Sequence, residues 1–400
     1  MAELEVSINN STNEPEQEFR TLVGPLEEKL GVRIRCTLVD WSEAWSEMMK
    51  IVLYKHGPVI SQVGNTWMGS LDATDGIRPL TSVEISRIGS AANFHPAAWQ
   101  TVISESGSQI TGVPWFLDAY MLYYRRDLLA KAGVDESSAF ASLEHLHETI
   151  AKLHASGCQI PLALPTQRST RASLHHLATW VWSHGGDFVS EDGQTLLLSD
   201  PKTRQGIRAY FSLYKNLPPA AQNLDDGDCF GTFLEGKAAM TLRNGGLLYD
   251  ARNSPSFSPY LDQLGLAAVP GVNFVGGSNL VLWKHIPPQM ERYAISLLEY
   301  LSSPEVQFAR HLRSAMLPAN VEALEKVRRE TDFAPVVDAI MAGRSFRKFR
   351  LWGLMEDKLT TAIGQIWQAL YSQENPNLEA EIANVLDPLE RRLQLTISNN

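Results

Sequence analysis

The chain has 400 residues, of which 44% are hydrophobic and 20% are charged. This length and composition allow more than one hydrophobic core, which excludes a disordered, collagen-like or coiled-coil protein. The formal charge is −10 without a block of like charge, which excludes a basic surface for nucleic acid, and no apolar run approaches the roughly 20 residues of a membrane span. The chain also has 10 tryptophans, a number that favours a surface for stacking.

The first hundred residues alternate between strand and helix patterns. Strands are expected at 5–9, 32–38 and 59–63, because apolar and polar side chains alternate there or form a short apolar run. Helical spacing of apolar residues is found between them, at 19–30 and 42–52. Strands separated by helices indicate βαβ units and a mostly parallel sheet.

The rest of the chain is richer in helix patterns. Helices are expected at 127–132, 143–157, 173–184, 201–214 and 228–235, and further helices start at Ser303 and near Ala319, Leu354 and Leu378. Strands are expected at 238–242, 264–269 and 278–283. No long linker separates these segments, so we expect domains that are discontinuous in sequence and joined by short crossings.

Local motifs of catalysis are absent from the sequence. It contains no Walker A segment, GxGxxG, GxSxG or HExxH, and no pair of carboxylates is marked as acid and base. The three cysteines, Cys36, Cys158 and Cys229, lie far apart and lack metal or redox spacing, so we expect small buried side chains. The sequence therefore predicts a protein that is not an enzyme and needs neither cofactor nor metal.

Five segments together resemble a known family. They are 59–67 (VISQVGNTW), 112–133 (GVPW, then LYYRRDLL and KAG), 233–240 (FLEGKAAM), 269–279 (VPG, then GGSN) and 302–307 (SSPEVQ). In this order they are similar to the extracellular solute-binding proteins of bacterial ABC importers, family 1, in the carbohydrate-binding cluster that includes maltodextrin-binding proteins.

The resemblance implies an α/β, periplasmic-binding-protein-like fold with two lobes and a cleft between them. Three short crossings would join the lobes, near 112–118, 270–277 and 316–320. The implied lobes are 1–112 plus 271–317 and 113–270 plus 318–400.

The resemblance also implies a function: capture of a mono- or oligosaccharide in the cleft by hinge closure, for the membrane subunits of an ABC importer. A monomer is expected, periplasmic or a cell-surface lipoprotein. The first residues lack a basic and an apolar signal region, which we interpret as removal of an export signal, with a cytosolic protein as the alternative. Two other functions stay open: the same fold with an amino-acid derivative, polyamine or ferric iron as solute, or a glycoside-active enzyme.

A sugar site needs aromatic rings for C–H faces and planar polar groups for hydroxyls, at the carboxyl ends of the strands. In the first lobe these positions hold Asn13 and Glu14, then Trp41, then Asn65, Thr66 and Trp67. Asn13 could instead cap the following helix. Of Trp41 and Trp45, we expect one to be exposed and the other packed.

The remaining candidate ligand residues lie at the crossings and in the second lobe: Trp115, Asp118, Trp182, Asn244, Gly277, Ser278 and Trp352. Asp118 could instead cap a turn. Trp352 is expected in a loop between helices, buried by either a core pocket or a sugar. The basic residues of 344–350 form either a solvated face or a site for an anionic ligand. The pair Tyr123 and Tyr124 could bind ferric iron, but its apolar surroundings favour a core or cleft wall.

Overall fold

The chain divides into two compact units. The computed structural model describes residues 2–10, 15–168, 171–348 and 350–398. The first unit comprises Met1–Asp118, Val275–Val337 and Lys348–Trp352, and the second comprises Ala119–Phe274, Asp338–Arg347 and Gly353–Asn400. The lobes expected from the sequence differ from this division at 318–337 and 348–352, which group with the first unit, and at the boundary segments 113–118 and 271–274.

The first unit contains a six-stranded sheet in the order β2-β1-β3-β8-β4-β9. Its strands are β1 (Ala2–Asn9), β2 (Val32–Val39), β3 (Ile60–Gly64), β4 (Val113–Ala119), β8 (Val275–Leu282) and β9 (Leu317–Pro318). β1 pairs in parallel with β2 and β3, but β8 is antiparallel to β3 and β9 to β4. The expected mostly parallel sheet is therefore wrong beyond the first three strands. Side-chain alternation does not encode strand direction, and β8 follows a return from the second unit.

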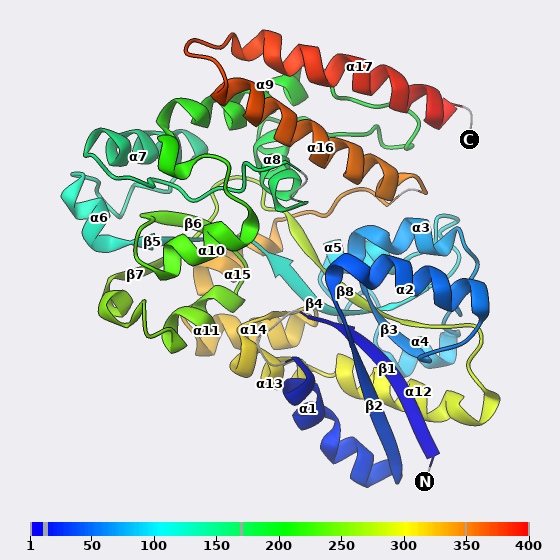
Figure 1. The fold of residues 1–400 in the computed structure, drawn as a ribbon. Coiled ribbons are helices and arrows are strands. Elements are labelled where there is room, and N and C mark those ends of the chain that lie inside the picture. Colours follow the sequence, from blue (N-terminus) through cyan, green and yellow to red (C-terminus); the bar gives the residue numbers. More distant parts are fainter. Residues whose placement is uncertain (1, 11–14, 169–170, 349, 399–400) are drawn as a thin grey trace. The chain divides into compact units, whose positions relative to one another are not determined.

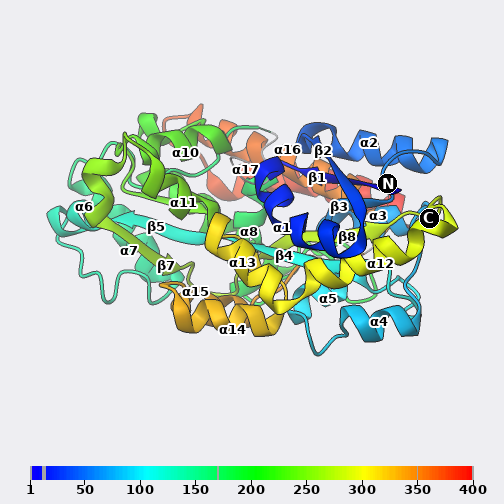
Figure 2. The ribbon, with the colours of Figure 1, turned by 90° about the horizontal axis from the view of Figure 1, so that it is seen from below.

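Helices cover both faces of the β1–β3 part of this sheet. The helices of the unit are α1 (Pro15–Leu30), α2 (Trp41–Tyr54), α3 (Met68–Asp72), α4 (Ser82–Ile88), α5 (Pro96–Val102), α12 (Pro288–Ser302), α13 (Pro304–Ser314) and α14 (Val321–Glu330), while α15 (Ala334–Met341) crosses the division. α1 and α2 lie on opposite sides of the strands (Figure 1), as right-handed crossovers in the order β2-β1-β3 require. Seen from below, α1, α12 and α13 lie side by side (Figure 2).

The second unit is mainly helical around a small sheet. Three antiparallel strands, β6 (Met240–Arg243), β5 (Met121–Arg125) and β7 (Leu264–Ala268), form it in that order. Its helices are α6 (Arg126–Lys131), α7 (Leu143–Ala155), α8 (Arg171–Ser183), α9 (Pro201–Phe211), α10 (Asp226–Leu234), α11 (Gly246–Asn253), α16 (Trp352–Tyr371) and α17 (Leu378–Ser398). Asp200 caps α9 by accepting hydrogen bonds from the backbone amides of Lys202 and Thr203.

Most strands and long helices expected from the sequence are confirmed, within a few residues at their ends. The expected loop position of Trp352 is wrong, because Trp352 is the first residue of α16 and is buried. Tyr123 and Tyr124 are confirmed as core residues. Tyr123 donates a hydrogen bond to the carbonyl of Asn244 (2.9 Å) and Tyr124 donates one to Glu136 (2.7 Å).

The three cysteines are free, and only Cys229 is fully buried. Burial raises the pKa of the Cys36 thiol to about 12, which keeps it protonated and unreactive at neutral pH. Across the described ranges, none of the helices combines the length and the apolar character needed to cross a membrane.

Gly277 in β8 provides the first prediction. Its φ is +137°, and an added Cβ would lie 2.1 Å from the Phe116 carbonyl oxygen. Gly277→Ala should therefore destabilise the protein by at least about 2 kcal/mol. The control is Gly231→Ala in α10, where an added Cβ has open space. This substitution should stabilise the protein by roughly 0.5–1 kcal/mol. Melting temperatures of the two variants test this, and equal values would contradict it.

Candidate functional site

A buried polar network fixes the carboxyl ends of the strands in the first unit. The Gln62 side chain in β3 is 1% exposed. Its Oε1 accepts a hydrogen bond from the Asn9 backbone amide (3.0 Å), and its Nε2 donates one to Ser278 Oγ (2.9 Å). Three strands, β1, β3 and β8, are thereby held in one register beside the candidate site.

Three tryptophans meet at the end of β3. Asn65–Trp67 forms a single 3₁₀ turn directly after the strand. Trp41 and Trp45 of α2 contact the Trp67 ring edge to face, with centroid distances of 5.6 and 5.8 Å. The expectation that one of Trp41 and Trp45 is exposed and the other packed is wrong. Both are partly buried, because both flank the central Trp67, which is 5% exposed.

Asn65 places an unused hydrogen-bond donor beside this cluster. Its side chain is 7% exposed, and its Nδ2 finds no hydrogen-bond partner in the described part of the chain. Buried amide groups are usually paired, so an unpaired one next to aromatic rings indicates a place for an acceptor from outside the protein. The neighbouring Thr66 is partly buried. The sequence-based candidates Asn65, Thr66 and Trp67 thus lie together.

Other candidates of the first unit have structural partners. Arg310 lies 4.4 Å from the ring centres of both Trp115 and Phe116, and its Nε donates a hydrogen bond to Glu18 (2.7 Å). Trp115 is 3% exposed and lines a cavity of only about 10 Å³, which is about the room of one water molecule.

Ser278 belongs to the polar network of Gln62, and the close backbone approach of Phe116 accounts for Gly277 without a ligand. Asp118 is partly buried near the end of β4. Asn13 and Glu14 lie outside the described residues.

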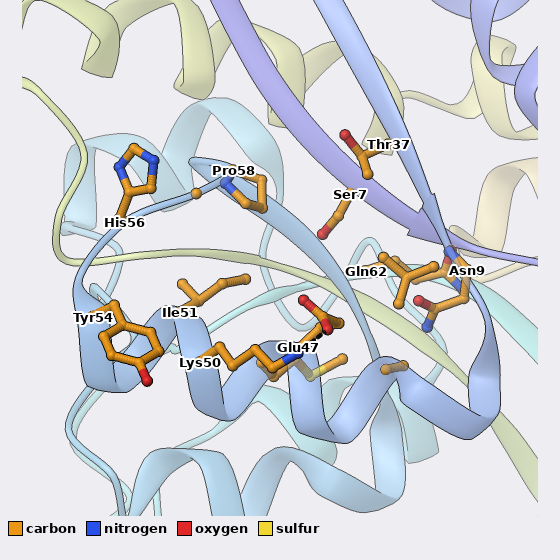
Figure 3. Close-up of a pocket in the computed structure, with 14 residues that line it drawn as sticks. Ser7, Asn9, Thr37, Glu47, Lys50, Ile51, Tyr54, His56, Pro58 and Gln62 are labelled. Atoms are coloured by element: carbon orange, nitrogen blue, oxygen red, sulfur yellow. Dashed lines mark hydrogen bonds and ion pairs between the residues drawn. The ribbon is translucent and has the colours of Figure 1, made fainter.

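A larger cavity of about 260 Å³ lies between α2 and the strands. Figure 3 shows Glu47, Lys50 and Ile51 of α2 on one side and Ser7 and Thr37 of the strands on the other. None of the predicted ligand residues lines it. The exposed side chains of Lys50, Tyr54 and His56 also line this space, so it is a pocket that opens to solvent at one end of α2.

Trp182 of the second unit is packed in an aromatic cluster. Phe274 stacks beside it at 6.3 Å, Phe346 contacts it at 5.3 Å, and the Arg344 guanidinium lies 4.7 Å from its ring centre. Its Nε1 donates a hydrogen bond to Asp187 (3.2 Å), and the side chain is 4% exposed. The predicted site residue Trp182 therefore serves the core of this unit in the unliganded protein.

The basic residues of 344–350 are largely engaged in ion pairs. Arg344 and Arg347 both donate to Asp187 Oδ2, at 2.5 and 3.2 Å. Lys348 pairs with Asp72 and donates a hydrogen bond to the carbonyl of Ile103 (2.6 Å). These three cations have internal anionic or carbonyl partners, which leaves less charge for an anionic ligand.

Asn244 follows β6 as expected and is partly buried. Its side-chain Oδ1 would lie 3.2 Å from a Cβ added at Gly246.

Two polar residues were not among the candidates predicted from the sequence: Gln62 in the first unit and Glu356 in the second. Two adjacent polar residues, Ser61 and Gln62, inside a short apolar strand were a usable signal for the first. Glu356 is one of 45 acidic residues in the chain, so the sequence contains no comparable signal for it.

Comparison with known proteins identifies the family. A family model described as bacterial extracellular solute-binding protein matches residues 55–308, which is more than half of the chain. The chain therefore belongs to this family. A stretch of 295 residues is 22% identical to the sn-glycerol-3-phosphate-binding periplasmic protein UgpB of Shigella dysenteriae serotype 1, covering 69% of this chain and 64% of that protein. The chain spans about half the length of the first curated relatives it matches.

Solved structures agree on the fold. The sugar-binding protein MalE from Xanthomonas citri matches with a TM-score of 0.82 at 18% identity, over 100% of this chain and 98% of that one. Maltose-bound MalE3 from T. maritima matches with a TM-score of 0.80 at 18% identity, over 98% and 99% of the two chains. The α/β, periplasmic-binding-protein-like fold expected from the sequence is confirmed.

The cavity beneath α2 provides the second prediction. Ala44 lines it and is 1% exposed, so Ala44→Leu should fill part of the empty space and stabilise the protein by roughly 0.5–2 kcal/mol. Ala251→Leu in α11 is the matched control, since Ala251 is fully buried but lines neither cavity, and overpacking there should cost roughly 1–3 kcal/mol. Denaturant unfolding measures both, and a destabilised Ala44→Leu would contradict the prediction.

Proposed function

We propose that this bacterial extracellular solute-binding protein captures a mono- or oligosaccharide and delivers it to the membrane subunits of an ABC importer. In this proposal the protein works outside the cytoplasmic membrane, in the periplasm or on the cell surface, and releases the sugar chemically unchanged.

The observation that carries the proposal is the group of residues at the end of β3. Trp41 supplies partly exposed aromatic surface that packs against the buried Trp67, and the unpaired Asn65 Nδ2 supplies a buried donor a few residues away. Aromatic rings suit the C–H faces of a sugar, and an amide suits its hydroxyl oxygens. A solute without such faces would leave the rings without a role in binding.

The named ligands of similar proteins support the same class of solute. UgpB is a binding protein for sn-glycerol 3-phosphate, and the MalE3 structure has maltose bound. Both ligands are small polyhydroxylated molecules. We favour the neutral sugar over the phosphorylated polyol, because Arg344, Arg347 and Lys348 already have partners within the protein.

The proposed mechanism is a shift between conformations. A sugar that contacts both units would bind a closed form better than an open one and shift the population toward it. Small-angle X-ray scattering tests this part, since the radius of gyration should fall when sugar is added. The other proposed ligand residues, including Asn13, Glu14, Asp118, Asn244 and Trp352, would complete the site.

A panel of solutes tests the proposal against its alternatives. Melting temperature should rise with at least one of glucose, maltose or ribitol, because a ligand that binds only the native state stabilises it. Spermidine, amino acids and ferric citrate represent other solutes of the same fold, and a rise with one of these alone would refute the sugar. Chromatography of the recovered sugar tests the enzyme alternative, which requires a cleaved product.

The third prediction concerns Trp67. Trp67→Ala should weaken binding of the sugar by about 2 kcal/mol or more, roughly 30-fold, as for other buried aromatic contacts. Tyr54→Ala on α2 is the control, because Tyr54 is 70% exposed and far along the helix from the cluster. Calorimetric titration measures both variants, and an unchanged dissociation constant for Trp67→Ala would remove Trp67 from the site.

A further inference from the structure

A carboxylate in the second unit is nearly buried without a hydrogen bond. The Glu356 side chain in α16 is 3% exposed. Arg171 Nε lies 4.0 Å from one of its oxygens, and His175 Nε2 lies 3.8 Å from the other. Both distances are longer than a hydrogen bond, and no closer donor is found in the described ranges of the chain. A buried carboxylate in this state destabilises the unliganded protein, and a ligand that donates to it would remove that cost.

The groups around Glu356 hold one another in place. The His175 ring stacks on Phe274, with a centroid distance of 4.2 Å and an angle of 12°. At the edge of the ring, His175 Nδ1 lies 3.3 Å from the Tyr120 hydroxyl, and the second ring nitrogen, Nε2, is directed toward Glu356. Arg171 is 53% exposed, which leaves this side of the cluster open to solvent.

Thr360 adds a second unused polar group on the same helix. It lies one turn after Glu356, on the same face of α16, and is 3% exposed. Its hydroxyl has no hydrogen-bond partner in the part of the chain that the structure describes. A carboxylate held only by long ion pairs and an unsatisfied hydroxyl, both nearly buried, therefore face the same side of the helix.

The charges near Glu356 decide what kind of donor fits. Arg171 already offsets the negative charge from 4.0 Å. An ammonium group would be repelled by the nearby guanidinium. A neutral hydroxyl avoids this repulsion and still donates to the carboxylate. Two adjacent hydroxyls could use both carboxylate oxygens, each of which has lone pairs to accept them.

We propose that Glu356 is the residue with which the second unit selects neutral hydroxyl donors, namely the adjacent hydroxyls of a sugar or sugar alcohol. His175 and Arg171 are positioning residues that hold the carboxylate in its orientation. This inference rests on the proposed function and narrows its solute to a neutral polyol, against an amino sugar or a polyamine.

Calorimetric titration of the full chain tests the assignment with glucose, maltose, ribitol and glucosamine as probes. The variants are Glu356→Gln, Glu356→Met and, as a control, Asp357→Asn, the adjacent carboxylate that is 67% exposed. Glu356→Gln should weaken the best neutral probe roughly 10- to 100-fold, as expected for loss of hydrogen bonds to a charged group. Glu356→Met should abolish binding, and Asp357→Asn should leave the affinity unchanged.

Melting temperatures without ligand separate a binding role from a structural one. If Glu356 serves binding, both Glu356 variants melt at or above the temperature of the unchanged protein, because an unsatisfied carboxylate has been removed. Two results would overturn the inference about Glu356 but leave the proposed function in place. One is unchanged affinity of Glu356→Gln for a neutral probe, and the other is tighter binding of glucosamine than of glucose. Failure of the unchanged protein to bind any of the four probes would overturn both.

Discussion

The candidate site in the first unit depends on the hydrogen bonds of one buried amide. Gln62 accepts from the backbone of Asn9 and donates to Ser278, so it connects β1, β3 and β8 at the level where the strands end. An amide in an apolar strand is costly unless both of its groups are paired, and this pairing occurs in only one register. The position of the Asn65–Trp67 turn follows directly from that register.

Each of the two units contains buried polar groups that lack close hydrogen-bond partners. In the first, Asn65 Nδ2 is buried and unpaired beside aromatic rings. In the second, the Thr360 hydroxyl is buried and unpaired, and the nearby Glu356 carboxylate has only long ion pairs with Arg171 and His175. A protein that only had to fold would pair these groups or replace them with apolar ones. Stability is lost at these places, and a polyhydroxylated solute has the donors and acceptors that would restore it.

Much of the fold could be predicted from the sequence, because its signals are local. Alternation gave β1 and β2, and Asp200 before Pro201 marked the start of α9. Strand direction could not be predicted, since β8 joins the sheet after a passage through the second unit. The candidate site residues differ in the same respect. Asn65–Trp67 could be proposed from the sequence because the segment directly follows a strand, whereas Glu356 acquires its burial only when α16 packs near α8.

Sugar capture by residues of both units can be measured by calorimetric titration of the unchanged protein with neutral sugars, followed by Trp67→Ala and Glu356→Gln. We expect saturable binding of a neutral sugar or sugar alcohol, and weaker binding by each variant. The melting temperature of Glu356→Gln should not fall. Binding of a cationic or ferric solute alone, with no response to any neutral sugar, would contradict sugar capture.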